Sequence, residues 1–200
     1  MCIRDRSNHD HSRFLTRTNH KVGRTNTLGP QAAEQGINKA VFREGVVIQM
    51  TWTGAPTIYY GDEAGVCGFT DPDNRRTYPW GHEDQVLLAF HKDIIRLRRE
   101  NEELRSGSLK MLESDYNFIS YGRFNRKGQC AVLINNNNHP ITKEIHVWEI
   151  GTPKTGKMKV ILQSRDDGYC MEGAEYEINA GKILIEMPQT SATILKFIEE

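Results

Sequence analysis

The side chains with the clearest potential for chemistry lie in the first third of the chain. His9-Asp10-His11 places two imidazoles around one carboxylate, and Asp62-Glu63 puts two carboxylates next to each other. Paired carboxylates are the usual apparatus of glycoside hydrolysis, whereas a His-x-His pair at a strand end can begin a zinc site. Asn and Asp before such a pair are also ordinary turn formers. Residue types alone leave all three interpretations open.

Asp62 and Glu63 end a stretch that reads as a short buried strand, residues 53–63. Pro56 favours extended backbone in the residue before it, and residues 57–60 are β-branched or aromatic. Apolar residues recur at helical spacing before the strand, over residues 31–50, and after it, over residues 83–100. We expect Pro30 to be the first residue of the earlier helix. The order helix, strand, loop, helix is typical of a βα barrel or a doubly wound sheet.

Three motifs in this region resemble the α-amylase superfamily of glycoside hydrolases. GAPTIYYGDE, residues 54–63, is similar to the last barrel strand of that family, and Asn8-His9-Asp10 followed by SRFLT is similar to its strand-seven motif. TDPDNRRTYPW, residues 70–80, resembles the loop after the last strand in the neopullulanase, cyclomaltodextrinase and oligoglucosidase branch. The implied fold class is α/β, with the last two βα units of a (β/α)8 TIM barrel over residues 7–105.

The resemblance also implies roles for individual residues. Asp10 would stabilise the transition state through hydrogen bonds to hydroxyls of the sugar next to the scissile bond, and His9 would form a hydrogen bond to a hydroxyl of the same sugar. Asp71 and Arg75 would reach sugars further toward the non-reducing side, although an internal ion pair that shapes their loop is the plain alternative. Asp62-Glu63 would be mainly structural, and the nucleophile and general acid would lie on earlier strands, outside this chain.

After residue 106 the pattern changes to short apolar runs separated by Gly, Asn, Asp and Pro, which predicts an all-β antiparallel sandwich domain over residues 106–200. Seven strands are expected: residues 109–112, 118–124, 130–134, 144–150, 157–162, 182–187 and 192–198. We predict a hairpin turn at residues 135–138 and a core position for Trp148. An exposed Trp148 would instead suggest an auxiliary carbohydrate site.

Residues 1–6, MCIRDR, match no part of the family pattern and resemble a translated sequencing-library adapter. We therefore treat them as a probable non-native leader and expect the natural protein to continue upstream of Ser7. On this view residues 7–105 would not fold stably alone, whereas residues 107–200 could.

Composition restricts the partners. With 26 acidic and 26 basic residues the formal net charge is zero, so no basic field favours nucleic acid. No apolar run reaches the length of a membrane span, and the four cysteines form no CxxC pair, which predicts free thiols and a cytoplasmic location. No cofactor is expected: the histidines form no second cluster for zinc, and no loop offers the six to eight oxygens of a calcium site, although calcium stays open.

The resemblance therefore implies part of a retaining glycoside hydrolase acting on the α-1,4 glucosidic bonds of maltooligosaccharides, cyclodextrins or related α-glucans, with α-1,6 bonds left open as a second linkage. The fragment itself should be inactive, because it lacks the nucleophile and the general acid. The longer parent could be a homodimer. Two alternatives stay open. One is a noncatalytic glucan-binding or accessory β-sandwich protein, and the other is a metal-dependent hydrolase with zinc on His9 and His11.

Overall fold

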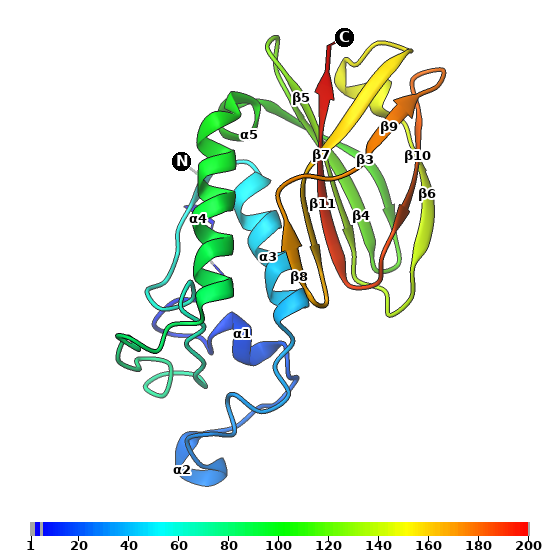
Figure 1. Ribbon diagram of the computed structural model, residues 1–200. Helices are drawn as coiled ribbons and strands as arrows, with labels where there is room; N and C mark the ends of the chain where they lie inside the picture. The colour runs from blue at the N-terminus through cyan, green and yellow to red at the C-terminus, as the bar shows by residue number, and fades with distance from the viewer. Residues whose placement is uncertain (1–2, 5, 200) are drawn as a thin grey trace.

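The computed structural model describes residues 3–4 and 6–199. Two helices lie against one face of a large antiparallel sheet, and irregular loops with two short helices gather beyond the ends of those helices (Figure 1). The first part comprises β1 (Ile3–Arg4), α1 (Phe14–Arg17), α2 (Thr25–Leu28), α3 (Lys39–Thr51), β2 (Ala55–Pro56), α4 (Gln85–Glu100) and α5 (Glu102–Ser106). No described helix is long and apolar enough to cross a membrane.

The predicted helix over residues 31–50 begins later than expected, so the expectation that Pro30 starts it is wrong. Residues 31–36 form turns, and Gly36 has a positive φ of 74°, which ends any helical path there. The side chain of Asn38 accepts hydrogen bonds from the backbone nitrogens of Ala40 (2.9 Å) and Val41 (3.1 Å) and caps α3. The second helix is as predicted: Asp84 caps α4, and basic residues occupy its last turn.

The strand predicted within residues 53–63 is reduced to β2, and residues 57–60 are not a strand in the structure. Only Ala55 and Pro56 pair, in parallel, with Ile3 and Arg4. The sequence predicts a non-native leader over residues 1–6, yet Arg6 contacts the fold: its Nε donates to Gln49 Oε1 at 3.0 Å and its Nη1 to the Phe42 carbonyl at 3.1 Å. The strand pattern fails because a strand needs a paired neighbour, and residues 57–60 have none within the described part of the chain.

The predicted antiparallel sandwich is confirmed. A seven-stranded sheet has the order β3-β4-β5-β11-β7-β8, with β9 also paired to β7, and a two-stranded sheet, β10-β6, covers its outer face. The strands and the short helix between them are β3 (Ser108–Asp115), β4 (Phe118–Phe124), β5 (Gln129–Asn135), β6 (Ile141–Ile145), η1 (Val147–Ile150), β7 (Gly156–Arg165), β8 (Gly168–Cys170), β9 (Glu175–Ile178), β10 (Ile183–Met187) and β11 (Ser191–Ile198). Sequence reasoning missed β8 and β9, which are short and half-polar.

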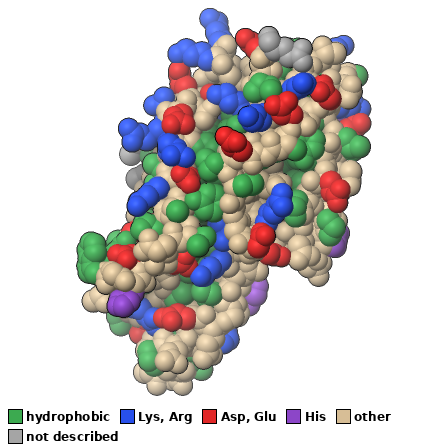
Figure 2. Space-filling model, in the orientation of Figure 1, with side chains coloured by type: hydrophobic (Ala, Val, Ile, Leu, Met, Phe, Trp, Pro, Cys, Tyr) green, Lys and Arg blue, Asp and Glu red, His purple; other side chains and the backbone are tan. Residues whose placement is uncertain are grey.

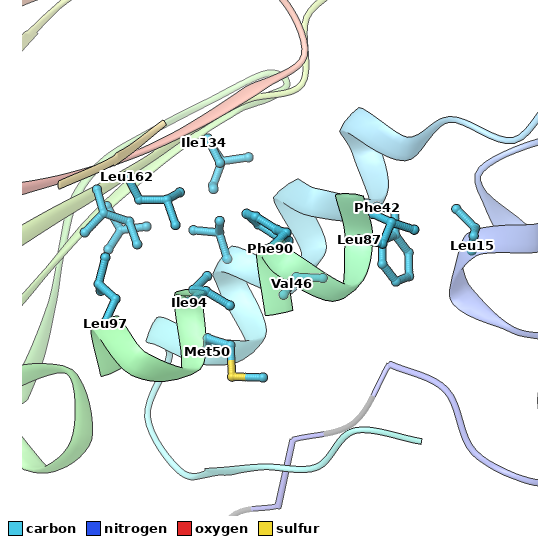
Figure 3. Close-up of a cluster of buried hydrophobic side chains, with 14 of the residues drawn as sticks. Leu15, Phe42, Val46, Met50, Leu87, Phe90, Ile94, Leu97, Ile134 and Leu162 are labelled. Atoms are coloured by element: carbon cyan, nitrogen blue, oxygen red, sulfur yellow. The ribbon is translucent and has the colours of Figure 1, made fainter. Parts of the chain in front are cut away.

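The central strands of the large sheet are buried on both faces. In β5, Cys130, Val132 and Ile134 face the helices, whereas Ala131 and Leu133 face the small sheet. Strand alternation therefore divides one continuous apolar run between two cores. The first core joins both halves of the chain: Figure 3 shows Phe90, Ile94 and Leu97 of α4 beside side chains of the sheet, with Leu15 of α1 at the far end of the cluster.

Two local predictions in the sandwich are wrong. Residues 135–138 do not form a hairpin turn, because β5 pairs with β4 and β11 while the following strand, β6, pairs with β10 in the other sheet. Trp148 is not a core residue; 52% of it is exposed, and it lies on η1, where its backbone nitrogen donates to Gly181. Periodicity could not separate a strand over residues 144–150 from the β6-η1 step that the chain adopts.

Candidate functional site

Arg13 is the side chain around which the candidate site is built. It is fully buried, its Nη1 lies 3.1 Å from Asp62 Oδ1, and its Nε donates to the Asn74 carbonyl at 2.9 Å. The same guanidinium donates to the Tyr60 carbonyl and stacks over the Tyr59 ring, 4.0 Å from its centroid. One buried cation thus joins the segment after β1, the residues after β2 and the loop that follows them.

Asp62 is the buried partner in this arrangement, as the structural interpretation of Asp62-Glu63 predicts. Burial raises the pKa of its carboxyl group, and hydrogen bonds from Ser7 and Arg13 oppose that shift. A carboxylate with 2% exposure and an ion pair to a fully buried arginine cannot meet a substrate. The geometry assigns Asp62 to the scaffold of the site.

The Asn8 side chain shapes the turn that carries His9 and Asp10. Asn8 Oδ1 accepts hydrogen bonds from the backbone nitrogens of Asp10 (2.9 Å) and His11 (3.1 Å). From the other side, Asn74 Nδ2 donates to the carbonyls of Asn8 (3.0 Å) and His11 (2.6 Å). This turn leaves the side chains of His9 and Asp10 63% and 67% exposed, with His9 Nε2 3.4 Å from Asp10 Oδ1.

Asp71 and Arg75 form an ion pair on the neighbouring loop. Arg75 Nε donates to Asp71 Oδ1, and this hydrogen bond raises the pKa of the guanidinium. Both side chains are about half exposed, so the ion pair lies at the surface. Thr70 Oγ1 donates to the Asp10 carbonyl at 2.8 Å, and this bond ties the loop to the Asn8 turn. The structure therefore brings the four predicted site residues onto two adjoining surface loops.

Sequence reasoning missed two residues that make this geometry possible. Asn74 is completely buried and bridges the two loops. A Cβ on Gly68 would lie 2.6 Å from the Asp73 carbonyl oxygen and 2.8 Å from Asn74 Cα, so glycine lets the loop pack this closely. A polar residue inside a turn-rich loop is too common a pattern to reveal such a role.

Metal-ligating side chains do not gather in the described residues. Within residues 3–4 and 6–199, no group of three or more His, Cys, Asp or Glu side chains could hold a metal ion. Among these residues, His9 and His11, the pair named for the zinc alternative, therefore belong to no such group. Cys67, Cys130 and Cys170 are free thiols, and burial raises the pKa of Cys67 to about 11. Cys2 lies outside the described residues.

Comparison with known proteins shows that the second half of the chain is similar to a known family of domains. Residues 110–198 match the model described as alpha amylase, C-terminal all-beta domain. The sandwich is thus similar to the α-amylase C-terminal all-beta domain, as the predicted resemblance requires. A neopullulanase of Thermoactinomyces vulgaris, 38% identical over 58% of this chain, and a cyclomaltodextrinase carry names from the predicted branch.

The relatives extend the likeness to the first half. An amylopullulanase of Thermoanaerobacter thermohydrosulfuricus is 32% identical over 190 residues, which cover 94% of this chain and 12% of that protein. A cyclomaltodextrinase of Thermoanaerobacter pseudethanolicus is 36% identical over 171 residues, 84% of this chain and 26% of the relative. The chain thus spans only 12% and 26% of the lengths of these two relatives.

Solved structures share the fold over almost the entire chain. The α-amylase of Geobacillus thermoleovorans, solved in complex with acarbose, superposes with a TM-score of 0.76 at 19% identity, over 98% of this chain and 38% of that one. A debranching enzyme from Nostoc punctiforme superposes with a TM-score of 0.67 at 22% identity, over 94% and 34%. Residues on both sides of Ser106 therefore have counterparts in these folds.

Proposed function

We propose that this chain acts as the carboxy-terminal part of a retaining α-glucan hydrolase that cleaves α-1,4, and in some substrates α-1,6, glucosidic bonds. Residues 7–105 would supply the last two βα units of its (β/α)8 barrel. The names of the relatives, amylopullulanase and cyclomaltodextrinase, support this substrate class. The observation that carries the proposal is the Asn8 turn, which presents His9 and Asp10 to solvent beside the loop of Asp71 and Arg75.

In this proposal Asp10 accepts hydrogen bonds from neighbouring hydroxyls of the sugar at the cleavage point. Its exposed carboxylate is free to turn toward a ligand, because the turn is held through backbone atoms and the Asn8 amide. Charge-assisted hydrogen bonds of this kind strengthen as the sugar ring gains positive charge in the transition state. His9 lies beside Asp10 and would bind a hydroxyl of the same ring.

Asp71 and Arg75 would bind the sugar on the non-reducing side. Their ion pair fixes the two side chains at the loop surface, where the remaining guanidinium N–H groups of Arg75 and the second Asp71 oxygen can meet hydroxyl groups. The ion-pair alternative and the binding role are therefore compatible, since the same contact orients both groups.

The 200-residue chain alone should not turn over substrate. A retaining mechanism needs two carboxyl groups about 5–5.5 Å apart, one as nucleophile and one as acid. Around Asp10, the Asp62 carboxylate is buried against Arg13 and that of Asp71 is paired with Arg75. The nucleophile and the acid would come from earlier strands of the longer protein.

The test is to extend the reading frame upstream of Ser7, express the longer protein and measure hydrolysis of maltoheptaose. Asp10→Asn should lower kcat/KM by roughly 10²-fold or more, because it removes transition-state stabilisation and leaves the turn intact. Glu172→Gln, which changes an exposed carboxylate of the sandwich, is the matched control and should retain activity. An Asp10→Asn enzyme as active as this control would refute the role of Asp10, and a longer protein inactive on α-glucans would refute the function.

The exposure of Trp148 favours a second candidate, a noncatalytic glucan-binding role for the sandwich. Its indole is half exposed next to Gly181, and the neighbouring Glu149 pairs with Lys110 at 2.9 Å, so a flat aromatic face lies beside charged groups. This candidate predicts that the chain binds maltooligosaccharides through Trp148. Unchanged affinity in Trp148→Ala would exclude it.

A further inference from the structure

The loop before α4, residues 77–82, projects an aromatic pair from the surface. Two backbone hydrogen bonds shape it, from Trp80 nitrogen to the Tyr78 carbonyl (3.0 Å) and from His82 nitrogen to the Pro79 carbonyl (2.8 Å). Gly81 has a φ of 78°, which lets the chain reverse directly after Trp80. In Figure 2, hydrophobic side chains cover a protruding edge at the left, over the loops that precede α4.

The two rings are packed against each other, with Tyr78 partly buried and Trp80 exposed. The centroids of Tyr78 and Trp80 are 4.5 Å apart with an interplanar angle of 46°, and 80% of Trp80 is exposed. An indole left in water forgoes the burial that normally stabilises a tryptophan. Holding it there in a shaped loop is typical of a binding surface.

A cleft runs along the same loop and is lined by residues next to Tyr78 and Trp80 in the chain. Its volume is about 620 Å³, within the range of ligand pockets, roughly 300–1,000 Å³, and its walls include Thr77, Pro79 and His82. Glu34 and Arg76 line the same cleft and form an ion pair of 2.6 Å. Arg76 also donates to the Pro30 carbonyl, so its guanidinium is held in place before any ligand arrives.

These features together favour a sugar over other ligands. Planar charged groups such as Arg and Glu match the paired hydroxyls of a hexose, and an aromatic face matches its apolar C–H face. A nucleic acid would also stack on the rings, but the charged pair in this cleft is neutral overall, and the chain has no net positive charge to attract phosphates.

We infer that Tyr78 and Trp80, with Arg76 and Glu34 beside them, bind a glucosyl unit of an α-linked glucan. The ring of the sugar lies over the indole, and its hydroxyls reach the Arg76-Glu34 pair in the cleft. This inference rests on the proposed function for its choice of sugar, and it adds a contact that none of His9, Asp10, Asp71 and Arg75 provides.

The test is the affinity of the full 200-residue chain for maltoheptaose, measured by calorimetric titration, with cellohexaose as the comparison ligand. Trp80→Ala should weaken maltoheptaose binding roughly tenfold or more, and Trp80→Phe should retain most of it, because a flat ring remains. Tyr116→Ala removes an equally exposed aromatic ring from the β3-β4 turn and should change nothing. Far-UV circular dichroism of each variant checks that the fold is intact.

Three results would overturn the inference: no maltoheptaose binding by the wild-type chain, equal affinity in Trp80→Ala, or loss of binding in Trp148→Ala with Trp80→Ala unaffected. The last result would move the site to the sandwich. Activity of the longer protein separates this inference from the proposed function. If the longer protein hydrolyses α-glucans but Trp80→Ala does not weaken maltoheptaose binding, only the binding surface is refuted. If Trp80→Ala weakens binding but the longer protein hydrolyses no α-glucan, only the proposed function is refuted.

Discussion

The two halves of the chain are stabilised by different means. In the sandwich, strands of three to ten residues pair in continuous ladders, and side chains alternate between two apolar cores. In residues 7–84, the long loops and the two four-residue helices outside α3 are joined through the buried polar groups Arg13, Asp62 and Asn74. A repeated apolar pattern determines the sandwich, whereas a few specific hydrogen bonds determine the loops of residues 7–84.

This difference predicts unequal tolerance to substitution. An apolar core accepts many side chains of similar volume, because the hydrophobic effect is not directional. A buried polar network does not, because removing one member leaves the others desolvated and unpaired. The loops that present His9, Asp10, Asp71 and Arg75 should therefore be the most fragile part of the chain. The candidate binding residues would then lie in the part of the chain that tolerates substitution least.

The largest effect is expected at Arg13. Arg13→Met keeps the length of the side chain but leaves Asp62 buried without its partner, which should cost about 3–5 kcal/mol of unfolding free energy. Urea denaturation measures the loss, and amide exchange should place it in residues 7–84 while β4, β5 and β11 keep their protection. Arg126→Met, at an exposed position, is the control. If Arg13→Met increased amide exchange equally in both halves, the two halves would not be stabilised by different means.

The next effect concerns the core that the halves share. Leu162 of β7 is fully buried among residues of α3 and α4, so Leu162→Ala should cost about 2–5 kcal/mol. This core contains residues from both sides of residue 106. Leu162→Ala should therefore lower the protection of backbone amides from hydrogen exchange in α4 and β7 together. Leu184→Ala, 67% exposed on β10, should stay within about 0.5 kcal/mol.

The shared core also bears on the prediction that residues 107–200 could fold alone. Tyr121, Val132, Ile134 and Ile194 are buried against the helices of the first half, so the separated sandwich would expose this apolar face. We expect it to fold with lower stability than in the whole chain and to associate as its concentration rises. A separated sandwich as stable as the intact chain would show that the helices contribute little to the core.

The contrast between halves also explains what could be predicted from the sequence. The sandwich strands followed from runs such as QCAVLIN in β5, because two-sided burial leaves an apolar signature. Apolar patterns could not predict where α3 starts or that residues 57–60 form no strand. These outcomes depend on a cap at Asn38 and on whether a partner strand is present, and neither is a periodic feature. The site residues were found through motif resemblance. Their support by Asn74 and Gly68 has no sequence signal beyond common loop composition.

A fourth prediction tests the junction between the two halves through Glu44 of α3. Its carboxyl group is buried, accepts a hydrogen bond from Asn136 Nδ2 at 2.6 Å, and has a pKa raised to about 8 by burial. The folded state therefore binds a proton that the unfolded state, with an ordinary glutamate pKa, has already released. Stability should fall as the pH rises from about 5 to about 8 and then level off.

Glu44→Gln removes this titration while keeping an acceptor for Asn136. Its unfolding free energy should depend less on pH than that of the wild type, and above about pH 8 the variant should be the more stable of the two. Glu172→Gln is the control, because this glutamate is exposed. Parallel pH profiles for wild type and Glu44→Gln would show that the carboxyl group is ionised in the folded protein.

The smallest effect on stability is expected at Asp71, and this separates binding from folding within the fragile half. Both members of the Asp71-Arg75 pair are largely solvated, so Asp71→Asn should leave the melting temperature unchanged. In the longer protein the same change should raise KM for maltooligosaccharides several-fold, because a charge-assisted bond to a hydroxyl is lost. Glu102→Gln, which breaks an ion pair of similar exposure with Lys127, is the matched control and should alter neither quantity. If Asp71→Asn lowered the melting temperature but left KM unchanged, the Asp71-Arg75 pair would be a structural element of the loop. Of the residues predicted from the sequence, only His9 and Asp10 would then remain as candidate sugar ligands.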